Sequence, residues 1–161
     1  MQEAARAARA AGLDVVAVDP GGALGDLPPW ARGVGPEEAA GLEGPCLVLV
    51  PDVAGALQDP TSPLGRALAR LSAPGSGCCA LMGASASDLT RLVSLPWGQR
   101  LASRSAWLWV GDGIGQQFAI RVSNPALELR LDLGEGGGWV VRRGRARAAK
   151  LVCLPDGAEW E

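Results

Sequence analysis

The chain has 161 residues, 48% hydrophobic and 20% charged, which suits a globular domain and excludes disorder over its whole length. Histidine is absent and lysine occurs once, at Lys150, so histidine-based triads, histidine-liganded zinc sites and a phosphate loop ending in Gly-Lys-Ser/Thr are excluded. The net charge of −2 is unevenly spread, with nine acidic and three basic residues in 1–60 against eight acidic and twelve basic residues in 61–161. A basic C-terminal part can orient binding to an anionic partner.

The first half of the sequence alternates between helical patterns and apolar strands. The expected elements are a helix over 2–11, a strand over 13–19, a short helix near 36–38, a strand over 45–50, a helix over 61–72, a strand over 78–82 and a short helix over 86–93. The glycine- and proline-rich segment 20–35 is expected to be a loop. Continuous apolar runs such as 45–50 are typical of parallel strands that are covered on both faces. Thr61 or Ser62 is expected to cap the helix over 61–72.

After Pro96 the pattern changes to a series of short strands. They are expected over 106–110, 117–122, 127–133, 139–142 and 149–154, with glycine-rich turns between them. The segment 127–133 alternates strictly between leucine and charged residues, which is typical of a strand with one wet face. The order of elements predicts an α/β fold with three layers and a mainly parallel sheet that antiparallel C-terminal strands extend. We expect a single domain over 1–155 and a flexible tail over 156–161.

Nothing in the sequence indicates a membrane segment. No stretch approaches the ~18 apolar residues that cross a bilayer, and the N-terminus lacks the apolar segment of a signal peptide. We therefore expect a cytoplasmic protein without membrane contact. The four cysteines are Cys46, Cys78, Cys79 and Cys153. Buried thiols in a reducing compartment are expected, and a bridge between the neighbours Cys78 and Cys79 is the alternative.

Two parts of the sequence resemble the core of the RecA recombinase family. They are VDPGGAL (18–24) followed by PWARGV (29–34), and LVLVPDVAGAL (47–57). In that family a strand ends in aspartate before an aromatic-Ala-Arg segment, and a second apolar strand also ends in aspartate. The resemblance covers about residues 2–138 and implies a RecA-like core, with Asp19 and Asp52 as its relic acidic positions.

The departures from the family pattern concern its nucleotide chemistry. The chain has no glycine-rich phosphate loop, Gly21 stands where the family has its water-activating glutamate, and Gly83-Ala84-Ser85 stands where it has a γ-phosphate-sensing glutamine. A lone carboxylate such as Asp52 is a weak metal site without phosphates to share the ion. We therefore expect no enzyme activity, no catalytic or metal-binding residues and no bound cofactor.

Three other groups of residues are candidates for function. The first is a basic segment over 142–150, which contains no acidic residue; its members are Arg142, Arg143, Arg145, Arg147 and Lys150. It is either a contact for nucleic acid or an acidic partner, or a solvated hairpin tip. Trp107 and Trp109 share a strand face, as core residues or as partner anchors. Ser85, Ser87 and Asp88 lack a base that could activate a serine, so we expect the serines to cap helices.

The resemblance implies a non-catalytic accessory or scaffold protein, closest to the RecA-like accessory proteins of the ImuA (SulA-like) kind. Those proteins serve bacterial DNA repair and SOS mutagenesis after DNA damage. The implied partner is a recombinase, a polymerase-like protein or a second copy of the chain, with weak DNA binding through 142–150. The alternatives are a degenerate FtsK-type motor domain, or a truncated ATPase whose phosphate loop lies upstream of Met1.

Overall fold

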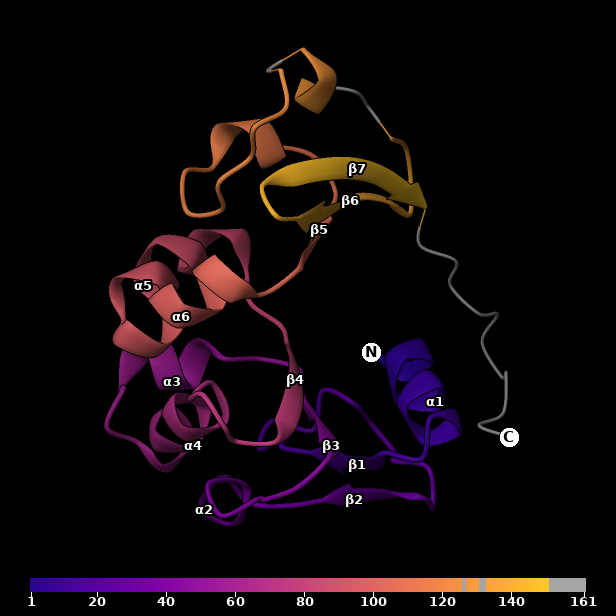
Figure 1. The fold of residues 1–161 in the computed structure, drawn as a ribbon, viewed down its shortest axis with the longest axis vertical. Coiled ribbons are helices and arrows are strands. Elements are labelled where there is room, and N and C mark those ends of the chain that lie inside the picture. Colours follow the sequence, from indigo (N-terminus) through magenta and orange to yellow (C-terminus); the bar gives the residue numbers. More distant parts are fainter. Residues whose placement is uncertain (126, 131–132, 151–161) are drawn as a thin grey trace. The chain divides into compact units, whose positions relative to one another are not determined.

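The computed structural model describes residues 1–125, 127–130 and 133–150. The chain folds as two compact units that divide between Arg100 and Leu101. Figure 1 shows the elements of each unit. The tail expected over 156–161 lies outside the described residues.

The first unit is built on a parallel sheet. Its four strands are β1 (Asp14–Ala17), β2 (Ala31–Gly33), β3 (Cys46–Val50) and β4 (Cys78–Met82), in the order β2-β1-β3-β4. The inner strand β3 contains the fully buried Val48 and Val50. The strands expected over 13–19, 45–50 and 78–82 are confirmed.

β2 lies inside the segment that was expected to be a loop. Its three residues pair in parallel with Val15, Val16 and Ala17 of β1. β2 has no apolar run, and Arg32 and Gly33 are exposed. The composition of this segment predicts a loop, whereas in the structure its pairing with β1 makes residues 31–33 a strand.

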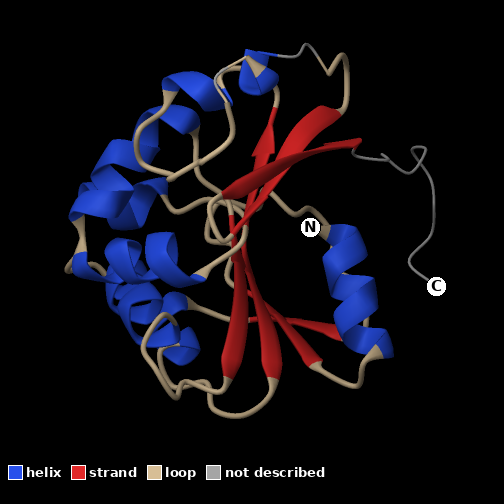
Figure 2. Cartoon of the chain, turned by 45° about the horizontal axis from the view of Figure 1, so that its top comes forward, coloured by secondary structure: helices blue, strands red, loops and turns tan. Residues whose placement is uncertain are grey.

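Helices cover both faces of the parallel sheet, as Figure 2 shows. The helices of the chain are α1 (Gln2–Ala10), α2 (Pro36–Ala39), α3 (Ala54–Gln58), α4 (Pro63–Leu71), α5 (Leu89–Ser94) and α6 (Pro96–Arg104). On one face α1 contacts β1 and β3, and its Ala5 and Ala8 pack with Val15 and Leu49. On the other face α4 contacts β4, and α2 and α3 pack against α4. Among the described residues, no helix combines the length and apolar character that a bilayer crossing requires.

The helix expected over 61–72 is confirmed as α4. The Ser62 hydroxyl, rather than that of Thr61, accepts the Gly65 N–H at 3.1 Å and caps the first turn. α3 and α6 were missed. α3 has only five residues, and Pro96, which was expected to end the helical part of the sequence, begins α6.

The second unit contains an antiparallel sheet of its own. Its three strands, in spatial order, are β5 (Trp107–Val110), β6 (Gly137–Arg142) and β7 (Arg145–Lys150). β6 and β7 form a hairpin whose two turn residues, Arg143 and Gly144, have φ angles of 51° and 75°. Both values suit a type I′ turn, which matches the twist of the flanking strands. These strands thus form a second sheet and do not extend the parallel one as expected.

Two strands expected in the second unit are not formed, so those predictions were wrong. At 117–122 the Gln117 side chain accepts the Ile120 N–H at 2.6 Å and donates to the Ile120 carbonyl oxygen at 2.8 Å, which occupies backbone groups that a strand would pair. Within 127–133, Glu128–Arg130 form a 3₁₀ turn, and residues 131–132 lie outside the described part. The strand over 139–142 is confirmed in β6, and β7 includes the described residues of the strand expected over 149–154.

Candidate functional site

The arginines of the C-terminal hairpin lie on one face of the antiparallel sheet. Arg142 of β6 is opposite Arg145 of β7, and Val140 is opposite Arg147. Since side chains alternate along a strand, Arg142, Arg145 and Arg147 project from the same face as Val140. All three arginines are exposed. The sequence predicted the basic segment, and the strand register brings these three of its members together.

The same face also exposes large aliphatic side chains. Leu108 of β5 is opposite Val140 of β6, and Val110 lies two residues further along β5. Leu108, Val110 and Val140 are 51%, 63% and 40% exposed. We call the surface that these residues form with the arginines the arginine face; its members are Leu108, Val110, Val140, Arg142, Arg145 and Arg147. The aliphatic members were missed, although their alternation with Trp107 and Trp109 in the sequence is the signal that could have found them.

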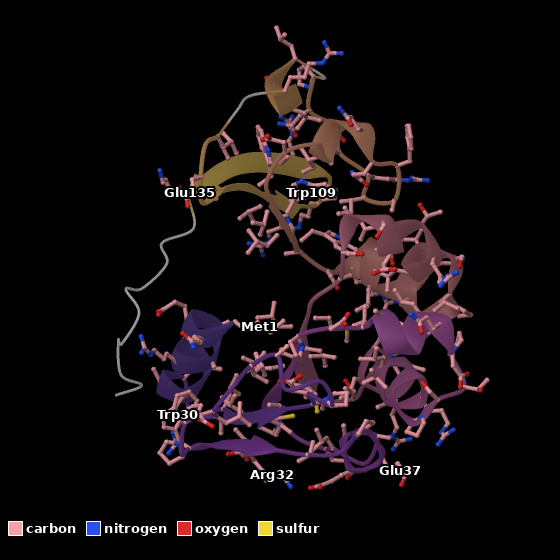
Figure 3. All side chains as sticks on the ribbon, turned by 180° about the vertical axis from the view of Figure 1, so that it is seen from behind. Met1, Trp30, Arg32, Glu37, Trp109 and Glu135 are labelled. Atoms are coloured by element: carbon pink, nitrogen blue, oxygen red, sulfur yellow. The ribbon has the colours of Figure 1, made fainter. Side chains whose placement is uncertain are left out.

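Both tryptophans of β5 lie on the opposite face of this sheet. Trp107 is paired with Val141 and Trp109 with Trp139, and both partners are buried. Trp107 and Trp109 are themselves half-buried, and the Trp109 indole N–H donates to the Asp112 carbonyl oxygen at 2.8 Å (Figure 3). The tryptophans therefore belong to the more covered face, and the aliphatic residues of the arginine face are the exposed apolar surface.

The remaining members of the basic segment are placed differently. Arg143 is at the tip of the hairpin, and Lys150 is opposite Gly137, on the face of Trp139. Within the part of the chain that the structure describes, no carboxylate lies within ion-pair distance of the arginine face; the ion pairs found there join Arg6 to Glu3 and Arg32 to Glu38. Among the described residues, the guanidinium groups of the arginine face thus have no carboxylate partner.

The outer edge of β7 is held by a short segment that precedes it in the chain. The Asn124 side chain accepts the Ala146 N–H at 2.7 Å and donates to the Ala146 carbonyl oxygen at 2.9 Å. The Ser123 N–H donates to the Gly144 carbonyl oxygen at 2.7 Å. These bonds therefore hold the outer edge of β7, the strand that carries Arg145 and Arg147.

Asp19 and Asp52 follow neighbouring strands at the carboxyl edge of the parallel sheet. Asp19 follows β1 and its Oδ2 accepts the Leu24 N–H at 2.6 Å, whereas Asp52 follows β3 and its Oδ1 accepts the Ala54 N–H at 2.8 Å. Each carboxylate therefore closes a local turn. No group of three or more potential metal ligands occurs among the residues described.

The serines after β4 do not cap a helix through their side chains. The Ser85 hydroxyl donates to Asp88 Oδ2 at 2.5 Å and lies 2.8 Å from the Ser87 hydroxyl. Ser85 precedes a 3₁₀ turn at Ala86–Asp88 without receiving a backbone N–H. Without a histidine or lysine beside it, this cluster has no general base of the usual kind to activate a serine.

Two arrangements thus bear on function: the arginine face in the second unit and the acidic turns in the first. No protein-family model, curated protein or solved structure matches this chain. The arginine face is the more exposed of the two arrangements, and its charges are not paired within the described residues. We therefore take it as the candidate functional site.

We expect Asn124→Ala to destabilise the second unit by about 1–3 kcal/mol, because two hydrogen bonds to β7 are lost at ~0.5–1.5 kcal/mol each. Urea denaturation followed by tryptophan fluorescence measures the change. Ser94→Ala is the control, because it removes an exposed hydroxyl that donates to the Arg91 carbonyl oxygen in α5. This substitution should not change the urea concentration at which the second unit unfolds. An Asn124→Ala protein with an unchanged transition would show that the bonds to Ala146 do not hold β7.

Proposed function

We propose that this chain is a non-catalytic RecA-like accessory protein of bacterial DNA repair or damage-induced mutagenesis, and that it acts by binding DNA and a protein partner. The arginine face is the observation on which the proposal rests. It combines three exposed guanidinium groups with an exposed aliphatic strip, and both are features of a binding surface.

The RecA-like part of the proposal is supported by the order of elements in the first unit. Apart from the short elements β2, α2 and α3, the chain runs through α1, β1, β3, α4 and β4, which is the order that the resemblance implies. Asp19 and Asp52 follow β1 and β3, at the strand ends where the family has its acidic residues. Helices on both faces of the parallel sheet are compatible with a three-layer core.

The non-catalytic part is supported by the residues that replace the nucleotide machinery. Gly21 offers no carboxylate to activate water, and Gly83 follows β4 where a phosphate-sensing side chain is expected. The Asp52 carboxylate is engaged in the turn before α3. Phosphoryl transfer requires groups that position the phosphates and groups that stabilise their developing charge. Gly21, Gly83 and the engaged Asp52 provide neither.

The composition of the arginine face favours single-stranded DNA over a duplex. Arginine guanidinium groups pair with phosphate oxygens in either form. A duplex hides its bases from a flat surface, whereas the bases of a single strand are free to contact apolar side chains. Leu108 and Val140 lie beside the arginines and can provide that contact.

We expect the triple variant Arg142→Ala, Arg145→Ala, Arg147→Ala to lose most of its affinity for a single-stranded oligonucleotide. Fluorescence anisotropy at several salt concentrations measures both the affinity and its dependence on salt. At roughly 0.7 released counterions per phosphate contact in single strands, the slope of log K against log salt should fall in magnitude by about 2.

A matched variant controls for the loss of charge. Arg9→Ala, Arg70→Ala, Arg91→Ala removes the same number of cations from exposed helical positions of the first unit and should keep the affinity and the slope. Equal losses in the two variants would mean that net charge, and not the arginine face, governs binding. Unchanged binding in the first variant would remove this face as the DNA site.

We expect no binding of ATP with magnesium at micromolar concentrations and no hydrolysis, because the groups that hold and cleave a triphosphate are missing. Calorimetry and a phosphate-release assay measure the two properties on a sample that binds the oligonucleotide. Micromolar affinity for ATP would contradict the non-catalytic proposal.

A second candidate is a RecA-like ATPase whose phosphate loop is encoded upstream of Met1. It is favoured by β4, an edge strand without the charges or proline that usually protect such edges, in which Cys79 and Ala80 are exposed. The Met1 side chain lies at the end of this strand, 3.5 Å from where a Cβ on Gly83 would be, so a strand preceding α1 could pair with β4 (Figure 3). A longer in-frame product that binds ATP would favour this candidate.

A further inference from the structure

Two cysteine thiols meet across the parallel sheet. Cys46 and Cys78 are the first residues of β3 and β4 and lie directly opposite each other in the strand register. Both are free thiols, and the Cys46 S–H donates to Cys78 Sγ across 2.9 Å. Neighbouring strands lie ~4.8 Å apart, within the ~4.4–6.8 Å range of Cα separations that disulfides adopt. A disulfide, with ~2.05 Å between its sulfur atoms, requires the thiols to close by less than about 1 Å.

Strand geometry separates the third thiol of this region from the pair. Cys79 follows Cys78, so alternation places the Cys79 side chain on the other face of the sheet. The vicinal bridge considered from the sequence would have to join side chains on opposite faces, and both thiols are free in the structure. The structure therefore pairs Cys78 with Cys46 and not with Cys79.

The two paired thiols differ in their access to solvent. Cys46 is only 6% exposed, whereas Cys78 is half-buried, with its sulfur 3.5 Å from the Gly44 carbonyl oxygen. Cys78 is thus the thiol that a small oxidant reaches first. Cys46 is the thiol placed to react next.

We infer that Cys46 and Cys78 are an oxidation site, at which hydrogen peroxide or a small-molecule disulfide converts the two thiols into a disulfide that links β3 to β4. The inference does not depend on DNA binding, because the pair lies in the first unit and the arginine face in the second.

The reaction with peroxide balances without another reactant. The Cys78 sulfur attacks one peroxide oxygen, the O–O bond breaks, and a sulfenic acid and one water form. The Cys46 sulfur then attacks the Cys78 sulfur, the S–O bond breaks, and the second water leaves. The two thiols lose two electrons and two protons, and one peroxide is reduced to two waters. A small-molecule disulfide accepts the same two electrons and leaves as two thiols.

The second step requires the Cys46 thiol to lose its proton. Burial, the hydrogen bond to Cys78 and the charges of Cys78, Asp14 and Cys79 together raise the pKa of the Cys46 thiol to about 12, with burial as the largest cause. The thiolate is the attacking form, so little of it is present near neutral pH. Since deprotonation increases as the pH rises, disulfide formation should become faster toward alkaline pH.

The test treats the reduced full-length protein with hydrogen peroxide under native conditions. Intact mass spectrometry should show the loss of two hydrogens, and dithiothreitol should restore the original mass. Trypsin digestion without reduction should give one linked product that joins the peptide containing Cys46 to the peptide containing Cys78 and Cys79. Oxidised glutathione should give the same product. A native protein that forms only sulfinic acid, a stable mixed disulfide or a link to Cys153 would overturn the inference.

Single substitutions identify the partner of Cys46. Cys79→Ser should keep the linked product, and Cys78→Ser should abolish it. The opposite pattern would assign the bridge to Cys79 and would also overturn the inference. Because the linked product is sought first in the unsubstituted protein, the test remains decisive even if Cys78→Ser fails to fold.

Discussion

The alternation of side chains across the β5-β6-β7 sheet separates the two surfaces of the second unit. The two-residue turn at Arg143 and Gly144 fixes the pairing of β6 with β7, and this pairing places Arg142, Arg145 and Arg147 on one face. A shift of one residue in β7 would move its arginines to the side of Trp139. The positive surface, the exposed aliphatic strip and the covered tryptophans therefore all follow from one strand register.

In the first unit, a buried parallel sheet holds short turns at the carboxyl ends of its strands. Asp19 and Asp52 close the turns after β1 and β3, so their carboxylates support the backbone at the carboxyl edge of the sheet. At the opposite edge, where β3 and β4 begin, Cys46 and Cys78 lie in contact. The two ends of the parallel sheet thus carry different groups, with aspartate turns at the carboxyl edge and a pair of thiols at the other.

The sequence was most informative where burial decides the structure. The apolar run of β3 and the helical spacing of α4 were predicted because each needs only local periodicity. β2 could not be predicted, since it is held by pairing with β1, and the expected strand over 117–122 failed because Gln117 bonds the backbone of Ile120. The basic segment was recognised from composition, but its division between two faces required the register of β6 and β7.

The central claim is that single-stranded DNA lies on the arginine face, and methyl NMR spectroscopy tests it most directly. The account predicts that adding an oligonucleotide shifts the methyl resonances of Leu108, Val110 and Val140. The methyl groups of Val141, which belong to the buried side of the same sheet, should move little. Shifts that are confined to the first unit, or no shifts at concentrations that saturate binding, would contradict the account.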